Sequence, residues 1–339
     1  MNRCIDLAKL GGGYAAPNPM VGAVLVYENT IIGEGYHEVY GGPHAEVHCI
    51  QSVSEENKYK IPHATLYVSL EPCAHYGKTP PCTELIISNG IKKVVVGTRD
   101  PFPAVNGKGI EKLREHGIEV VSSVLETECR LLNKRFFSLY ERNRPYIILK
   151  WAQSSNLKIA GNDDQRLMIS NDFSNRLVHK WRSEEASILV GTNTALLDDP
   201  ALTTRLWSGR HPIRLVLDMD LKLPSHLKLF NRKASTVIFN AISHEENSEI
   251  FYFRIDRDMN VIRQIIHGLK ELSIQSVMVE GGAMLLQSFI DEGIWDEIRT
   301  ITNNNLIVEE GLEAPTMHNA CLVDQFSLQN DTVSFYHHT

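Results

Sequence analysis

Two short motifs decide the fold and chemistry of this chain: His44-Ala45-Glu46, and the run PCAHYGKTPPC at residues 72–82. One imidazole, from His44, and two thiols, from Cys73 and Cys82, are three zinc ligands that leave a fourth tetrahedral position for water. Glu46 follows the histidine by two residues, so its carboxylate can exchange protons with that water. These residues predict a catalytic zinc site with an acid/base group beside it.

The spacing of the two cysteines distinguishes this segment from shorter motifs. Zinc deaminases typically show H-x-E followed by P-C-x-x-C, whereas eight residues lie between Cys73 and Cys82 here. The same spacing argues against a redox C-x-x-C pair. A closed structural zinc site, with His48 or His75 nearby, is an alternative, and so is a set of buried residues that bind no zinc.

The loop between the cysteines carries His75, Lys78 and Thr79. A lone lysine is usually a solvated surface charge, but these three residues beside a catalytic metal suit an anionic substrate. We therefore expect this loop to recognise a phosphate or a ring.

The composition is that of an ordinary globular protein. The chain has 339 residues, of which 43% are hydrophobic and 22% charged, and this length suits two domains of about 150 residues each. We find no apolar run that could span a membrane and no apolar core of a signal peptide. The net charge of -7 gives no general argument for nucleic-acid binding. With six cysteines and no export signal, we expect a reducing, cytoplasmic location and neither a membrane nor a nucleic-acid partner.

The first half of the chain predicts an α/β layer fold. We expect strands over residues 21–27, 30–36, 64–70, 94–97 and 119–122, and helices over 1–10, 44–53, 82–88, 108–116 and 125–142. The first two strands form a hairpin, and helix and strand alternate afterwards. The polar segment ERNRP at 141–145 follows the last helix, so we place the domain boundary between residues 144 and 145.

His44 and Cys82 both lie at the predicted start of a helix. The positive end of a helix dipole favours thiolate over thiol. Two thiolates and a neutral imidazole would balance the charge of a zinc ion, and such a site lowers the pKa of bound water to about 7.

Further motifs resemble the deaminase half of the bifunctional riboflavin-biosynthesis deaminase/reductase family. They are PNP (17–19) with VG (21–22), HAEVH (44–48) and the run from 70 to 82, and the resemblance covers residues 1–145. It implies a cytidine-deaminase-like fold in which Glu46 is the catalytic proton shuttle. The implied reaction is hydrolytic deamination of 2,5-diamino-6-(5-phosphoribosylamino)pyrimidin-4-one by zinc-activated water. By motif match, the substrate contacts are Asn18, His37, His75, Lys78 and Asp100. Phe102 departs from the family, which usually has asparagine there.

The second half of the chain predicts another α/β domain with a mainly parallel sheet. We expect strands over residues 146–152, 187–191, 214–218, 236–240 and 276–280, and helices over 169–185, 192–197, 261–272 and 283–291. Gly281 and Gly282 lie between a strand and a helix, where glycines let a phosphate approach the backbone and the helix N-terminus. A plain tight turn is the alternative for this pair.

The motifs VEGG (279–282), LDDP (197–200) and LTTR (202–205) resemble the reductase half of the same family. The resemblance implies a dihydrofolate-reductase-like fold that binds NADPH and reduces the ribosyl chain to give 5-amino-6-(5-phosphoribitylamino)uracil. The implied cofactor contacts are Ala152, Met168, Thr194, Asp198, Gly282, Ala283, Met284, Leu285, Leu286, Gln287 and Ser288. The implied substrate contacts are Arg166, Arg182, Leu202, Arg205 and Glu280. Two of these, Arg182 and Arg205, suit a phosphate, which arginine grips in a bidentate manner.

The leading hypothesis is therefore a bifunctional enzyme with Zn²⁺ and NADPH, which acts on a small phosphorylated pyrimidine and forms a homo-oligomer. The alternative is a deaminase with a degenerate, structural C-terminal domain. It is motivated by Asn156-Leu157, where the family has Asp-Gly, and by Met168, which stands where an aromatic residue usually meets the cofactor. A zinc-stabilised nucleic-acid-binding module and a deaminase of tRNA bases are disfavoured by the negative charge and by the wide cysteine spacing.

Overall fold

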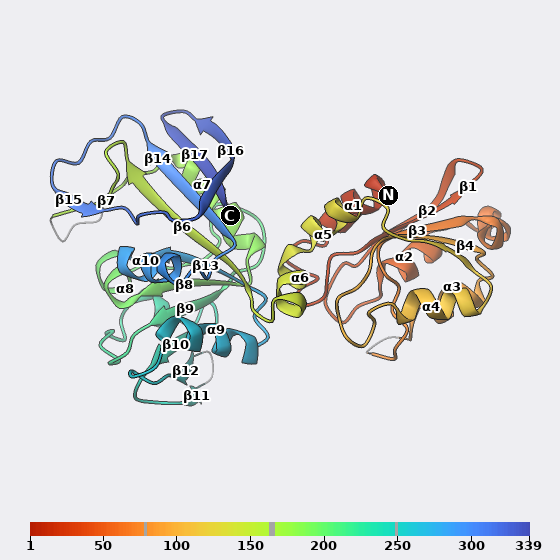
Figure 1. Ribbon diagram of the computed structural model, residues 1–339, viewed down its shortest axis with the longest axis horizontal. Helices are drawn as coiled ribbons and strands as arrows, with labels where there is room; N and C mark the ends of the chain where they lie inside the picture. The colour runs from red at the N-terminus through yellow and green to blue at the C-terminus, as the bar shows by residue number, and fades with distance from the viewer. Residues whose placement is uncertain (78–79, 163–166, 248–249) are drawn as a thin grey trace. The chain divides into compact units, whose positions relative to one another are not determined.

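The computed structural model describes residues 1–77, 80–162, 167–247 and 250–339. The chain folds into two compact units, Met1–Asn143 and Arg144–Thr339 (Figure 1). Among the described residues, no helix is both long and apolar enough to cross a membrane.

The first unit is built on a five-stranded sheet with the order β2-β1-β3-β4-β5. Its strands are β1 (Gly22–Tyr27), β2 (Thr30–Tyr36), β3 (Thr65–Leu70), β4 (Lys93–Thr98) and β5 (Glu119–Val121). β1 runs antiparallel to β2 and β3, whereas β3, β4 and β5 are parallel. The predicted hairpin and the α/β alternation are confirmed.

The helices of this unit are α1 (Asn2–Lys9), α2 (Ala45–Gln51), α3 (Cys82–Ser88), α4 (Lys108–Glu115), α5 (Glu126–Leu132) and α6 (Lys134–Glu141), with a 3₁₀ helix over Glu55–His63 that we did not predict. α2 lies close against β2 because the strand carries glycine there. A Cβ atom at Gly35 would lie 2.3 Å from the backbone N of Cys49. The close approach fixes the helix that begins beside His44.

The predicted single helix over 125–142 is wrong, because the chain breaks at Asn133 between α5 and α6. The Asn133 amide is buried and pairs with the backbone of Met20: it accepts from the Met20 N–H at 2.8 Å and donates to the Met20 carbonyl at 2.8 Å. Asparagine readily bonds to backbone groups in this way and so leaves the helical conformation. This partner lies 113 residues away in sequence, so a local pattern does not reveal it.

The second unit is built on a ten-stranded sheet with the order β11-β12-β10-β9-β8-β13-β6-β14-β17-β16. The strands from β12 to β14 in this order are parallel to one another, which confirms the prediction of a mainly parallel sheet. The strands are β6 (Tyr146–Ser154), β8 (Ser187–Gly191), β9 (Ile213–Leu217), β10 (Thr236–Asn240), β11 (Glu245–Asn247), β12 (Ile250–Arg254), β13 (Ser276–Gly281), β14 (Glu297–Asn303), β16 (Ala320–Leu328) and β17 (Asp331–His338). β7 (Lys158–Gly161) and β15 (Gly311–Glu313) form a separate antiparallel pair.

In the described part of this unit, the α-helices are α7 (Asp172–Glu184), α8 (Thr192–Asp198), α9 (Val261–Glu271) and α10 (Ala283–Asp291), and a short 3₁₀ helix covers Lys228–Phe230. The predicted helix over 169–185 begins later, at Asp172, because Asn171 caps it. The Asn171 side chain accepts hydrogen bonds from the N–H groups of Phe173 and Ser174, as expected of an N-cap. β14 and the strands β17 and β16, which continue the sheet from it with antiparallel pairing, lie beyond the last element that we predicted.

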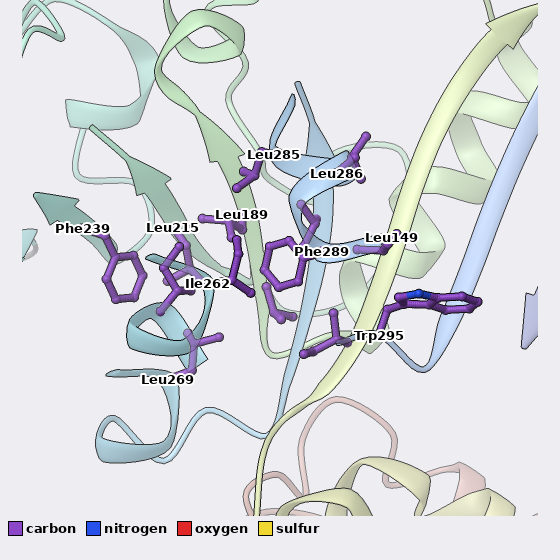
Figure 2. Close-up of a cluster of buried hydrophobic side chains, with 14 of the residues drawn as sticks. Leu149, Leu189, Leu215, Phe239, Ile262, Leu269, Leu285, Leu286, Phe289 and Trp295 are labelled. Carbon is purple, nitrogen blue, oxygen red and sulfur yellow. The ribbon is translucent and has the colours of Figure 1, made fainter. Parts of the chain in front are cut away.

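Helices α9 and α10 pack on one face of the ten-stranded sheet and bury apolar side chains against it (Figure 2). Each fully buried leucine or phenylalanine contributes about 1.5–3 kcal/mol relative to exposure. The labelled members of this cluster are Leu149, Leu189, Leu215, Phe239, Ile262, Leu269, Leu285, Leu286, Phe289 and Trp295. The cluster holds the start of α10 at the end of β13.

The turn between β6 and β7 contains Leu157 in the left-handed conformation, with φ of 62°. Leucine pays a steric cost there that glycine does not. The Asn156 side chain fixes the same turn, because it donates to the Val308 carbonyl at 2.8 Å and accepts from the Val308 N–H at 3.1 Å. The turn is therefore fixed by Asn156 and strained at Leu157.

We predict that Leu157→Gly stabilises the second unit, because glycine removes the strain of positive φ. The free energy of unfolding should rise by about 1 kcal/mol, and the midpoint of thermal unfolding by about 2–4 °C. Leu157→Ala is the matched control, since alanine keeps the strain and the leucine side chain is largely exposed. An equal gain from alanine would contradict the explanation.

Candidate metal centre and cofactor cleft

The three predicted metal ligands meet at one point of the first unit. His44 Nδ1 lies 3.3 Å from Cys82 Sγ and 3.6 Å from Cys73 Sγ, and all three ligand atoms lie within 4.8 Å of one another. Ligand atoms around a tetrahedral zinc ion stand roughly 3.5–4 Å apart, given Zn–S and Zn–N bonds of about 2.3 and 2.0 Å. Sulfur and imidazole ligands also favour zinc over harder cations, so these residues fit a zinc ion.

Two helix starts and one strand end bring these ligands together. His44 is the N-cap of α2, and Cys82 is the first residue of α3, as predicted. Cys73 follows the end of β3 and is held to α3, because its sulfur accepts a 3.3 Å hydrogen bond from the Cys82 N–H. The Thr83 N–H also donates to the Cys73 carbonyl at 3.1 Å.

Hydrogen bonding among the ligands displaces their pKa values in opposite directions. The bond with the Cys82 side chain lowers the pKa of Cys73, and the same bond raises the pKa of Cys82. The bond with Cys73 raises the pKa of His44. Two thiols this close, one buried (Cys82) and one half-buried (Cys73), cannot both ionise easily unless a cation lies between them. This is the electrostatic reason that the set fits a divalent metal.

Glu46 lies in the first turn of α2 and is only 3% exposed. Burial raises its pKa, so its carboxyl group holds a proton more readily than a solvated glutamate does. It lines a pocket of about 340 Å³ together with His44 and Cys73. We call this space the metal pocket.

Asn18 and His37 lie on one wall of the metal pocket and fix each other's orientation. His37 Nδ1 is 3.0 Å from the Pro43 carbonyl oxygen, which can only accept, so Nδ1 carries the proton. In the neutral ring Nε2 is then the acceptor for the Asn18 amide at 3.0 Å. Burial lowers the pKa of His37 and favours this neutral form.

Asp100 lies on another wall of the metal pocket, and Glu71, which we did not single out, positions it. The Glu71 carboxylate is 4% exposed and accepts from the N–H groups of Asp100, Gly107, Gly109 and Ile110 at 2.9–3.2 Å. Burial raises the pKa of Asp100 to about 7, so this group can carry a proton and donate a hydrogen bond near neutral pH. The acidic residue before Pro72-Cys73 was the signal that could have identified Glu71.

Aromatic rings line the metal pocket near Phe102, the residue that departs from the family pattern. The Phe102 ring meets the rings of His75 and Tyr140 edge to face, with centroids 5.8 and 5.2 Å away. His75 Nδ1 is buried and has no hydrogen-bond partner among the described residues, which leaves it available to a ligand. Lys78, the other predicted contact in this loop, lies outside the described residues.

We predict that Cys73→Ser removes the metal, because a hydroxyl group replaces one of two thiolate ligands. The wild-type protein should retain about one zinc per chain after gel filtration with a weak chelator, and the variant nearly none. Elemental analysis measures this. Cys321→Ser is the matched control, since Cys321 is exposed and far from the ligands in sequence; loss of zinc from that variant would contradict the assignment.

The second unit contains a cleft of about 1620 Å³ at the ends of the parallel strands. Gly281 and Gly282 lie on its wall, between β13 and α10, and Gly282 is the N-cap of that helix. A Cβ atom at Gly282 would lie 3.1 Å from Thr194 Oγ1. The glycine therefore keeps open a gap between α8 and the start of α10, where N–H groups can meet a phosphate.

The structure places most of the predicted cofactor contacts on this cleft, but not all. Those that line it are Ala152, Met168, Thr194, Asp198, Gly282, Ala283, Met284, Leu285, Leu286 and Ser288. Gln287 does not line it. Its side chain instead accepts from the Thr316 N–H at 2.8 Å and donates to Asp291 at 2.7 Å, because it lies on another side of α10. Leu285 and Leu286 are also core residues.

The predicted substrate contacts Arg182 and Glu280 form a buried ion pair at the cleft. Two guanidinium nitrogens of Arg182 donate to the two carboxylate oxygens of Glu280 at 2.8 and 2.6 Å. Burial by itself would raise the pKa of Glu280, but Arg182, together with Lys150, lowers it to about 2. Glu280 is therefore ionised throughout the neutral range.

Lys150 is a cleft residue that we did not predict to have a function. Its side chain is 12% exposed, and Nζ lies 3.9 Å from Glu280 Oε2. A single lysine inside the apolar strand YIILKWA (146–152) was the signal that could have identified it, because a lysine is seldom buried without a partner.

Leu202 and Arg205 also line the cleft. Leu202 is 1% exposed and has a positive φ of 48°, and Arg205 Nη1 donates to Thr203 Oγ1 at 3.3 Å. Arg166 lies outside the described residues. The positions of these residues do not show what the residues bind, so the predicted substrate contacts stay predictions.

Comparison with protein families finds a match in each unit. Residues 1–98 match the cytidine and deoxycytidylate deaminase zinc-binding region, and residues 145–307 match the RibD C-terminal domain. Among curated proteins, the riboflavin biosynthesis protein RibD of Aquifex aeolicus is 44% identical over 304 residues, which cover 88% of this chain and 84% of that protein. The RibD protein of Escherichia coli is 33% identical over 321 residues, 88% of this chain and 85% of that protein.

Solved structures of the same kind resemble the whole chain. A diaminohydroxyphosphoribosylaminopyrimidine deaminase/5-amino-6-(5-phosphoribosylamino)uracil reductase from Thermotoga maritima superposes with a TM-score of 0.91 at 36% identity and covers 100% of this chain and 97% of its own. RibD of Acinetobacter baumannii gives a TM-score of 0.89 at 30% identity with the same coverage.

Proposed function

The chain belongs to the family of riboflavin biosynthesis proteins RibD, and on that premise we propose which residues carry out each of its two reactions. We assign residues 1–144 to a zinc-dependent pyrimidine deaminase domain and residues 145–339 to an NADPH-dependent reductase domain. The division of the chain into two compact units, with the boundary between Asn143 and Arg144, supports this assignment. The two family matches lie on either side of the same point.

The protein is a bifunctional deaminase and reductase of riboflavin biosynthesis that uses Zn²⁺ and NADPH. The comparisons give no support to the alternative of a purely structural C-terminal domain, since the match runs through residues 145–307. We propose 2,5-diamino-6-(5-phosphoribosylamino)pyrimidin-4-one as the first substrate and its deaminated product as the second. The observation that carries this proposal is the gathering of His44, Cys73, Cys82 and Glu46 at one pocket of a chain that also holds the cleft.

In the deamination, water adds to the ring carbon that bears the exocyclic amine, and the carbon–nitrogen bond then breaks to release ammonia. Zinc, when bound by the three ligands, supplies the Lewis acidity that makes a water molecule more acidic. Glu46 takes a proton from the water and gives one to the departing amine. Its burial beside the ligands suits this exchange, because burial raises the pKa of the carboxyl group and so favours its uptake of a proton from water. Asp100 and Asn18 orient the ring from the walls of the pocket.

Replacement of Glu46 by glutamine should abolish only the first reaction. The amide keeps the shape of the side chain but cannot shuttle protons, so ammonia release should fall by about 10²–10⁴-fold. Reduction of the deaminated intermediate and the zinc content should stay at wild-type values.

An ammonia assay and NADPH absorbance measure the two steps on the same preparation. Glu56→Gln is the control, since Glu56 is an exposed carboxylate elsewhere in the first unit. Equal loss of both reactions in a folded Glu46→Gln variant would argue against separate sites.

In the reduction, a hydride adds to the anomeric carbon of the ribosyl chain, and the oxygen that leaves this carbon needs a proton. NADPH supplies the hydride. We propose that Lys150 supplies the proton, because its ammonium group lines the cleft beside the ionised Glu280. Arg205 and Arg182 lie on the same cleft and suit the substrate phosphate. Arg182 can use Nη1 for this, because Glu280 accepts from its Nε and Nη2.

We predict that Lys150→Met slows the reduction selectively, because methionine fills similar space without a transferable proton. The kcat for reduction should fall by about 10²–10⁴-fold, with ammonia release unchanged. Single-turnover oxidation of NADPH, measured at saturating cofactor, tests this. Lys180→Met on α7 is the control, since Lys180 is half exposed. If the variant has a normal kcat and only weaker cofactor binding, Lys150 is not the proton donor.

We also propose that the protein acts in a reducing compartment, the cytoplasm, as a homo-oligomer without nucleic-acid or membrane partners. The thiols of Cys73 and Cys82 support the first point, because they must stay reduced to bind a metal. Sedimentation at several protein concentrations tests the oligomeric state.

A further inference from the structure

His179 is a buried histidine that neither proposed reaction uses. It lies on α7, is 5% exposed, and lines the cleft together with Arg182 and Arg205. Its Nδ1 accepts a 2.9 Å hydrogen bond from the backbone N–H of Arg205. We propose that His179 is a positioning residue of the reductase site: it holds the backbone of residues 202–205 so that the Arg205 side chain reaches the substrate phosphate. This inference rests on the proposed role of Arg205.

The segment that carries Arg205 is held through its backbone amides. The Thr204 N–H donates to His211 Nδ1 at 3.3 Å, and the next amide, that of Arg205, donates to His179. His211 is exposed, whereas His179 is buried. Hydrogen bonds in a buried place are shielded from competing water, so His179 is the firmer of the two attachments.

The direction of the Arg205 side chain depends on this backbone. Arg205 Nη1 donates to Thr203 Oγ1 at 3.3 Å, so the guanidinium group is tied to a residue of the same segment. Thr203 is 5% exposed, and Leu202 before it has a positive φ of 48°. Because Leu202 and Thr203 are buried, the segment cannot shift easily, and any displacement of its backbone would move the guanidinium group of Arg205 as well.

The neutral form of His179 is the form that can accept a hydrogen bond at Nδ1. Burial, followed by the nearby charges of Arg182 and Arg205, lowers its pKa to about 4. The ring is therefore neutral in the neutral range and keeps a lone pair on Nδ1 for the Arg205 amide. A protonated ring would have no lone pair to offer and would add a third positive charge beside two arginines.

The test compares two substrates on wild-type protein and on His179 variants. One substrate is 5-amino-6-(5-phosphoribosylamino)uracil, and the other is the same compound without its phosphate. His179→Phe keeps a ring without an acceptor, and His179→Asn places an oxygen near the position of Nδ1. We expect H179F to raise KM for the phosphorylated substrate about tenfold, with kcat within about twofold, and to leave KM for the other unchanged. H179N should restore KM to within about threefold of wild type.

A double variant separates positioning from a general structural role. If His179 acts through Arg205, adding H179F to Arg205→Gln should change KM for the phosphorylated substrate by less than about twofold. The proposal is overturned if H179F impairs both substrates equally, if H179N fails to rescue, or if the two substitutions act independently. H179L replaces H179F if thermal unfolding shows that the phenylalanine variant does not fold.

Failure of the proposed function gives a different result. Wild-type protein that reduces neither substrate would refute the proposed reductase function. Wild-type protein that shows no preference for the phosphorylated substrate would refute the phosphate-binding role of Arg205, before any His179 variant is compared. Wild-type preference for the phosphorylated substrate, combined with unchanged KM in H179F, would refute only the role of His179.

Discussion

Both candidate sites depend on one constraint: their residues must lie where a buried parallel strand ends and the chain turns toward a helix. In the first unit β3 and β4 are neighbours, and their ends deliver Cys73 and Asp100 to the same pocket. In the second unit β13 ends at Gly281, where α10 begins. Free N–H groups and positive helix ends gather at such places, which suits thiolates in one unit and phosphates in the other.

Buried ionised or ionisable groups hold these strand ends in position. Glu71 ties the turn that carries Cys73 to the loop after β4 and to the start of α4, through four backbone N–H groups. Glu280 has the corresponding place in the second unit, where it binds Arg182 and lies near Lys150. Removing one partner from such a buried arrangement leaves a charge without compensation and is strongly destabilising. Glu71 and Glu280 thus hold the strand ends and also line the two candidate sites.

Local patterns were sufficient to predict most of the helices and strands and the three side chains that meet in the candidate metal centre, because apolar periodicity and ligand spacing are local properties. They failed where distant partners decide. Asn133 breaks a helix through its bonds to Met20, and Gln287 turns from the cleft toward Thr316. The function that we propose for Lys150 depends on its neighbour Glu280. Lys78 and Arg166 are outside the described residues, so their predicted roles rest on motif resemblance alone.

We propose that one chain deaminates a phosphoribosylated pyrimidine and then reduces the product. The most direct test supplies purified, zinc-loaded protein with the diaminopyrimidine substrate and NADPH, and follows ammonia and NADPH together. We expect about one NADPH to be oxidised per ammonia released, with oxidation lagging behind ammonia. After chelation of zinc, oxidation should persist only when the deaminated intermediate is supplied. NADPH oxidation from the diaminopyrimidine without ammonia release, or ammonia release with no oxidation of NADPH, would contradict the account.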